Sequence, residues 1–213
     1  DSPALYVSPV CREGPSSMTY HPDDVASYYA ALFAARYDAY SAWTPVGWRP
    51  VREPLTIEVV KAGLSKTGPS ISAFMIAPGS ISHVVALDYD LDDGFALASA
   101  LIRFMGDQGI PAYVETSRRG AHLWCGLDQQ APAVAIRAAM RGLLQAAGQP
   151  DDPHIELRPG SDHVSDDGLG HALRMPFMPH PKTGVTGKMY DADGNRLGPT
   201  ISAALLSFET AKV

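Results

Sequence analysis

The spacing of apolar side chains changes along the chain, and each spacing predicts a type of element. From Val25 to Tyr37, apolar residues recur at steps of three and four, which is the spacing of one face of a helix. Pro22 and the two acids that follow it suit the first turn of that helix. The first part of the chain predicts these segments in order: an irregular arm over 1–20, a helix from 22 to about 41, a loop over 43–54, a short helix over 56–61 and a strand over 72–77.

The pattern becomes more regular in the rest of the chain. β-Branched runs predict strands, and Ala- and Leu-rich segments that end at glycine predict helices. The expected elements are a strand over 83–90, a helix over 95–105, strands over 112–116 and 121–127, a helix over 131–147 and a strand over 154–157. This order is the split-βαβ unit. We therefore predict an α+β fold with a split-βαβ (RRM/ferredoxin-like) core, an N-terminal α/β extension and a C-terminal β-plus-helix segment with strands near 172–176 and 188–190 and a helix from 202.

Length and composition bound this fold. The chain has 213 residues, of which 46% are hydrophobic, so it can bury a core and is not a disordered chain. We expect residues 1–213 to form one domain, with an N-terminal subdomain over 1–80 and an RRM-like half over 81–213. The start, Asp1-Ser2-Pro3, has neither an initiator Met nor a signal-peptide pattern, so we expect a fragment of a longer protein. There is no apolar run of about 18 residues, which predicts no membrane span.

Cysteine usage and charge narrow the function classes. Cys11 and Cys125 lie far apart and form no CxxC pair, so the sequence predicts neither a zinc knuckle nor a disulfide framework. The formal net charge of −6 argues against a protein whose whole surface binds nucleic acid. The charge is unevenly distributed, however, because no acidic residue occurs between Gly168 and Tyr190.

The first strand of the regular half ends in Asp88-Tyr89-Asp90. Side chains two apart on a strand share a face, so both carboxylates point the same way. At a separation of about 4 Å and an effective dielectric of about 20, their repulsion is about 4 kcal/mol. A hard divalent cation with oxygen ligands would offset it. A solvated acidic turn is the open alternative, because Asp92 and Asp93 follow at once.

The split-βαβ topology brings other chemical groups beside these acids. In the expected strand order 4-1-3-2, the end of strand one lies beside the starts of strands three and four, where His122 and Glu156 occur. Glu156 is a candidate third metal ligand, although it could equally pair with Arg158. His154 faces the opposite side and is interpreted as structural. His122 is either a functional histidine or a satisfied core histidine.

Two cationic segments carry groups suited to phosphate. Ser117-Arg118-Arg119-Gly120 supplies a hydroxyl, guanidinium groups and a flexible turn, with Arg118 expected to face outward. The second segment, over 174–184, holds Arg174, His180 and Lys182 among three prolines, which lower the ordering cost of binding a polyphosphate. A solvated basic loop is the alternative for this second segment. The motifs GxxxxGK[ST], GxSxG and HExxH are absent.

With these residues in place, the chain resembles the catalytic domains of the archaeo-eukaryotic primase superfamily, of the prokaryotic, phage and plasmid type. The resemblance covers roughly residues 45–190 and rests on four motifs: Asp88-Tyr89-Asp90, Ser117 through His122, Ile155-Glu156, and the segment from Arg174 to Gly184. The last segment departs from the family at a Tyr-Ser pair, which is Phe177-Met178 here. The zinc-binding cysteines of many relatives are missing.

The resemblance implies a DNA primase-polymerase that transfers nucleotides by a two-metal mechanism in primer synthesis or extension. It implies that Asp88, Asp90 and Glu156 hold two Mg²⁺ or Mn²⁺ ions, with no zinc. It implies that the triphosphate is bound by Ser117, Arg119, His122, Arg174, His180 and Lys182. The partners would be single-stranded DNA template and primer, NTPs or dNTPs, and a C-terminal helicase or accessory domain, in a cytoplasmic location.

Two other functions are compatible with a split-βαβ sheet but fit the residues of this chain less well. A rolling-circle replication initiator, which nicks single-stranded DNA, needs a His-hydrophobe-His pair, whereas the His122 strand reads His-Leu-Trp. A non-catalytic RNA-recognition module would expose aromatic residues on its two central strands. Those strands carry Asp88, Asp90 and His122 instead.

Overall fold

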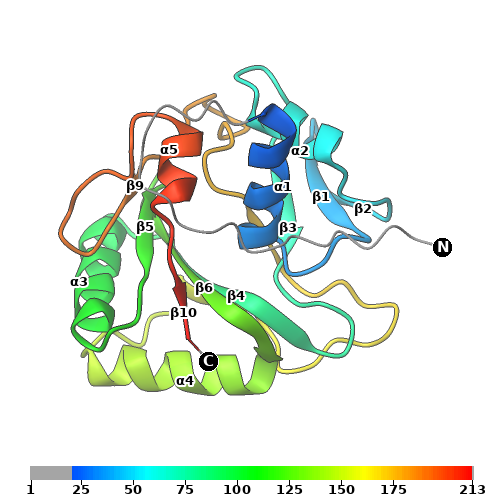
Figure 1. The fold of residues 1–213 in the computed structure, drawn as a ribbon. Coiled ribbons are helices and arrows are strands. Elements are labelled where there is room, and N and C mark those ends of the chain that lie inside the picture. Colours follow the sequence, from blue (N-terminus) through cyan, green and yellow to red (C-terminus); the bar gives the residue numbers. More distant parts are fainter. Residues whose placement is uncertain (1–20, 213) are drawn as a thin grey trace.

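The structure is a computed structural model that describes residues 21–212, so the arm expected over 1–20 lies outside the described residues (Figure 1). The described chain folds into two sheets with helices packed on them. The elements in chain order are α1 (Pro22–Phe33), β1 (Tyr40–Thr44), β2 (Gly47–Val51), α2 (Ile57–Leu64), β3 (Ile71–Phe74), β4 (Ile81–Tyr89), α3 (Gly94–Asp107), β5 (Tyr113–Thr116), β6 (Ala121–Pro132), α4 (Ala133–Ala146), β7 (Ile155–Arg158), β8 (Ala172–Arg174), β9 (Met189–Tyr190), α5 (Ile201–Leu206) and β10 (Thr210–Ala211).

The larger sheet contains the split-βαβ unit. Its strands lie in the order β7-β4-β6-β5-β9, and β10 pairs with β6. In terms of the unit's own strands this is the order 4-1-3-2, so the predicted α+β fold is confirmed. Alternate residues of β4 face opposite sides, as period two requires. Val85, Leu87 and Tyr89 belong to the apolar cluster that includes residues of α3 and α4, whereas Val84 and Ala86 belong to the other cluster.

The smaller sheet has the order β2-β1-β3-β8. Its last strand comes from far along the chain, because β8 pairs with β3 in a register that sets Ser72 opposite Arg174. The C-terminal segment therefore completes the N-terminal sheet. The apolar cluster that includes Phe33, Met75 and Trp124 fills the space among α1, this sheet and the face of the larger sheet opposite α3 and α4.

Two expectations for the N-terminal part are wrong. The helix predicted to reach residue 41 ends at Phe33, where Ala34 takes an extended backbone. Apolar spacing continues, but tertiary contacts override it: the buried Arg36 pairs with Asp38 and donates to the carbonyl of Gly168. The loop predicted over 43–54 is the hairpin β1–β2. Its Pro50 is tolerated because β2 is an edge strand.

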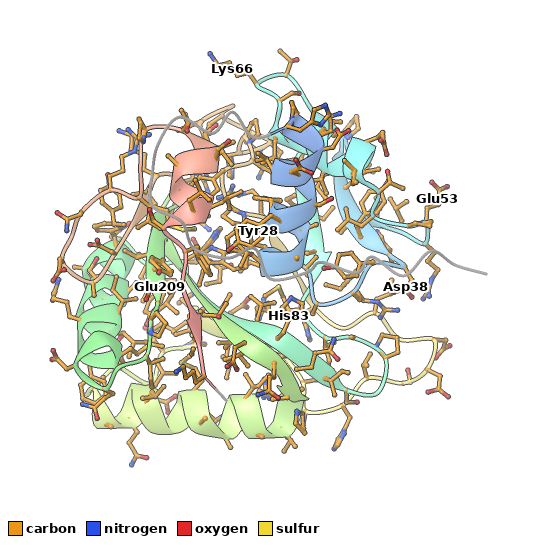
Figure 2. All side chains as sticks on the ribbon, in the orientation of Figure 1. Tyr28, Asp38, Glu53, Lys66, His83 and Glu209 are labelled. Carbon is orange, nitrogen blue, oxygen red and sulfur yellow. The ribbon has the colours of Figure 1, made fainter. Side chains whose placement is uncertain are left out.

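Helix α1 packs on the larger sheet through apolar side chains and one hydrogen bond. The Nε2 atom of His83, on β4, lies 2.8 Å from the carbonyl oxygen of Ala31, and the side chain sits between helix and sheet (Figure 2). Burial lowers the pKa of His83, so the neutral ring donates this bond.

Cys125 is a buried free thiol, while Cys11 lies outside the described residues. No helix within 21–212 has the length and hydropathy needed to cross a bilayer.

Candidate active site

A cleft of about 580 Å³ lies between the two sheets and is lined from both sides. Strands β1, β2, β3 and β8 form one wall, and β4 and β6 with the turn before β6 form the other. The residues that line it are Ser41, Trp43, Trp48, Ser72, Asp88, Asp90, Ser117, Arg118, Arg119, His122, Gly170, His171, Ala172, Leu173, Arg174, His180, Pro181 and Lys182. Eight of the nine site residues expected from the sequence are in this set, and Glu156 is not.

Two acids mark the end of β4. Asp88 is in register with His122 on one side and with Glu156 on the other. Its Oδ1 lies 3.5 Å from the Nε2 of His122. Asp90 follows the strand, and its N–H donates to the carbonyl of His154 over 3.0 Å. Arg119 forms an ion pair with Asp90, so one of the two carboxylates is compensated by a guanidinium group.

Glu156 is adjacent to Asp88 in the sheet but makes a different contact. Its carboxylate forms an ion pair with Arg158 and is half exposed. Within residues 21–212, His, Cys, Asp and Glu form no group of three that could hold a metal ion. Asp88 and Asp90 still offer carboxylate oxygens to one cleft, and these are the donors that Mg²⁺ and Mn²⁺ prefer. The donor set therefore fits a hard divalent cation.

The turn between β5 and β6 brings hydroxyl and guanidinium groups to the same end of the cleft. The Oγ of Ser117 accepts a bond from the N–H of Gly120 over 3.2 Å, which closes the turn. Arg118, which we expected to face outward, is exposed and also lines the cleft beside Arg119. His122 is the second residue of β6 and is buried. The turn thus places two guanidinium groups next to the acids.

The second cationic segment enters from the opposite wall. Arg174 is buried on β8, and its guanidinium donates to the carbonyl of Met178 over 2.8 Å. Partial burial lowers the pKa of His180, and the positive charges of Arg174, Arg118 and Lys182 lower it further. The cleft therefore presents several positive charges around His180, and the acids Asp88 and Asp90 lie in the same lining. Such a site is suited to an anion that carries several negative charges.

A family model described as the archaeo-eukaryotic primase domain of TOTE conflict systems matches residues 24–198. The chain belongs to this family. Among solved structures, the polymerase domain of ligase D from Mycobacterium tuberculosis, in complex with DNA, is similar over 75% of this chain and 77% of that chain, with 18% identity and a TM-score of 0.38. The comparison with curated proteins found no match.

The primase-family chain has a buried acid that our sequence reasoning missed. Glu115, on β5, has no solvent exposure, and one of its oxygens lies 3.1 Å from Nδ1 of His122 and 3.5 Å from a guanidinium nitrogen of Arg174. Its other oxygen accepts the N–H of Phe177 over 2.8 Å. The signal was a lone charge in the apolar strand over 112–116, because a buried charge requires partners.

Two tryptophans of the primase-family chain were also missed. Trp43 and Trp48 lie in the segment that we expected to be a loop, and both line the cleft. The hairpin sets them directly opposite each other, and their rings meet edge to face with centroids 5.5 Å apart. The Nζ of Lys182 lies 5.8 Å from the centroid of Trp43. Neighbouring prolines hid the strand pattern that would have revealed this pair.

Proposed function

We propose that this domain is a DNA primase-polymerase, which transfers nucleotides from nucleoside triphosphates to a growing strand under the direction of a single-stranded DNA template. The observation that carries the proposal is the cleft, where Asp88 and Asp90 lie among cationic groups from two distant segments. Membership of a primase family supports the same reaction. The reaction would serve primer synthesis, extension or both during replication.

Asp88, Asp90 and Glu156 are the proposed ligands of two divalent ions, Mg²⁺ or Mn²⁺. Bound ions would supply Lewis-acid stabilisation of the triphosphate and a more acidic primer 3′-hydroxyl. Arg119 forms an ion pair with Asp90, and Arg158 forms one with Glu156. A triphosphate offers Arg119 a second anion beside the one it already pairs with. We infer that this guanidinium shifts from carboxylate to phosphate on binding.

The triphosphate is proposed to lie along the cationic cleft. Ser117, Arg119 and His122 would contact it from the β6 wall, and Arg174, His180 and Lys182 from the other wall. The hydroxyl, guanidinium and ammonium groups of this set donate hydrogen bonds toward the place where negative charge develops on the leaving pyrophosphate. Glu115 would act as a positioning residue, because it is ionised and fixes the side of the His122 ring that faces away from the cleft.

The organisation of the chain is part of the proposal. Residues 1–213 would form one domain, with a subdomain over 1–80 and an RRM-like half over 81–213. Pairing of β8 with β3 supports a single unit, because the two parts share a sheet. A helicase or accessory domain in a longer protein would supply additional contacts to the DNA.

The deciding experiment is primer extension and de novo synthesis with Mn²⁺, comparing the wild type with Asp88→Ala/Asp90→Ala. We expect incorporation to fall by at least about a thousandfold, as for loss of metal-stabilised charge in a transition state. The matched control is Asp92→Asn/Asp93→Asn, which removes the same charge from exposed positions outside the cleft lining. The control should keep wild-type incorporation.

Equal incorporation by the wild type and the Asp88/Asp90 variant would show that this cleft is not the polymerase site. Nicking of single-stranded DNA by a wild type that incorporates no nucleotide would contradict the proposal in favour of a nuclease. Wild-type binding of RNA with neither activity would favour a recognition module.

A further inference from the structure

Trp43 and Trp48 form an aromatic surface on the wall of the cleft that faces the acids. They are register partners on β1 and β2, so both side chains leave the same face of the smaller sheet. The edge-to-face contact, with an interplanar angle of 81°, fixes each ring relative to the other. The hairpin therefore presents two adjoining aromatic rings to the cleft.

These rings are not part of either apolar core. Both side chains are partly exposed, whereas the third tryptophan, Trp124, is fully buried. Neither Trp43 nor Trp48 belongs to the two clusters of buried residues within 21–212. The part of each tryptophan side chain that faces the cleft exposes apolar area to water, and a ligand that covered this area would gain the free energy of burying it. The packing of the described residues thus gives this pair no structural partner in the core.

The surroundings of the pair limit what that ligand can be. The ammonium of Lys182 lies over the Trp43 ring at 5.8 Å, and Arg174 and His180 line the same cleft. An apolar peptide or lipid would bury these charges without compensation. A ligand that combines a flat, polarisable ring with several phosphates satisfies both the rings and the cations. A nucleotide has that combination of groups.

We propose that Trp43 and Trp48 form the surface against which the base of the incoming nucleoside triphosphate stacks. This inference rests on the proposed function and adds the contact that holds the base. The incoming nucleotide is favoured over a template base because the ammonium of Lys182 lies over the Trp43 ring and belongs to the proposed triphosphate site. One bound molecule can therefore engage the ring and the ammonium together. Stacking accepts every base, as a template-directed enzyme requires.

The test compares two probes on the whole chain with Mn²⁺ and no DNA, by titration calorimetry. The probes are dATP and inorganic tripolyphosphate, which has the phosphates without a base. We expect Trp48→Ala and Trp43→Ala to weaken dATP binding by about tenfold, the usual contribution of one stacked base. Tripolyphosphate affinity should stay unchanged in Trp48→Ala. Trp48→Phe keeps an aromatic face and should recover most of the dATP affinity.

The control is Val46→Ala, which alters the turn of the same hairpin at a side chain that is 73% exposed. It should bind both probes as the wild type does. Equal loss of both probes in Trp48→Ala would overturn the proposal, because the ring would then only support the hairpin. Weaker binding of single-stranded DNA with unchanged dATP affinity would overturn it in favour of a template base. A wild type that binds neither probe would overturn the proposed function as well. If the wild type binds both probes and the tryptophan variants bind dATP equally well, only the stacking proposal is overturned.

Discussion

Glu115 is a carboxylate with no solvent exposure, surrounded by groups that compensate its charge. Burial alone would raise its pKa, but the positive charge of Arg174 and the hydrogen bond from His122 hold that pKa below its usual value. An ionised carboxylate only accepts hydrogen bonds, so Nδ1 of His122 carries the proton. Phe177, which donates to the same group, has a φ of 62°, a conformation that strains a residue other than glycine. One side chain thus holds the His122 ring and the start of the second cationic segment.

Replacing Glu115 by Gln tests this role. The amide keeps the shape but removes the charge, which leaves Arg174 buried without its counter-ion. We expect the free energy of unfolding to fall by about 3 kcal/mol, at the low end for breaking a buried ion pair. Primer extension should show a raised KM for the nucleotide, because Arg174 and His122 are no longer held in place.

The positioning role is separated from simple loss of stability by the ring nitrogens of His122. Their NMR shifts should show a proton localised on Nδ1 in the wild type and a redistributed proton in Glu115→Gln. The control, Glu53→Gln, changes an exposed glutamate at the periphery of the molecule that does not line the cleft, and it should alter neither stability nor KM (Figure 2). An unchanged His122 signal in Glu115→Gln would contradict the role.

At the scale of elements, what could be predicted depended on whether the signal was local. The strand that carries Asp88 and the one that carries His122 were predictable, because their β-branched and apolar runs are local and the split-βαβ order places them side by side. The hairpin β1–β2 was not, since Pro50 breaks the pattern and only the edge position of β2 permits it. The partners of Glu115 were also beyond a local pattern, because Arg174 joins from a distant strand.

The turn between β5 and β6 packs so closely on the end of β4 that only glycine fits at position 120. A methyl group on Gly120 would overlap the carbonyl oxygen of Tyr89. We expect Gly120→Ala to displace the turn, separate Arg119 from Asp90 and lower the free energy of unfolding by about 1–3 kcal/mol, the usual cost of overpacking. Chemical denaturation measures this loss, and primer extension should fall with it.

The matched control for Gly120 is Gly142, which is exposed on α4 and has no atom within 4 Å of an added methyl group. Gly142→Ala should raise the free energy of unfolding by about 1 kcal/mol, because alanine favours the helix. Gly120→Ala with wild-type stability would show that the turn is not tightly packed on β4.

At the scale of the whole molecule, the net charge of −6 conceals a division between the cleft and the rest. The cleft lining contains two acids and four Arg or Lys side chains, so its local balance is positive. Many of the other acids are exposed, Asp92 and Asp93 among them, and these would repel a nucleic acid that approached outside the cleft. We therefore expect the domain to bind single-stranded DNA through few phosphate contacts, with modest affinity.

That expectation can be measured as a salt dependence. Each phosphate neutralised on a single strand adds about 0.7 to the slope of log K against log salt. If exposed Arg118 contacts the template strand at the mouth of the cleft, Arg118→Ala should reduce the slope by about 0.7 and weaken binding equally for all sequences. The control is Arg141→Ala, because Arg141 is exposed on α4, which covers the face of the larger sheet opposite the cleft (Figure 1). Fluorescence anisotropy over a salt series gives both slopes. Equal slopes of log K against log salt for Arg118→Ala and the wild type would place the DNA strand away from the cleft mouth. A reduced slope in Arg141→Ala would mean that DNA binds over the whole surface despite the net charge.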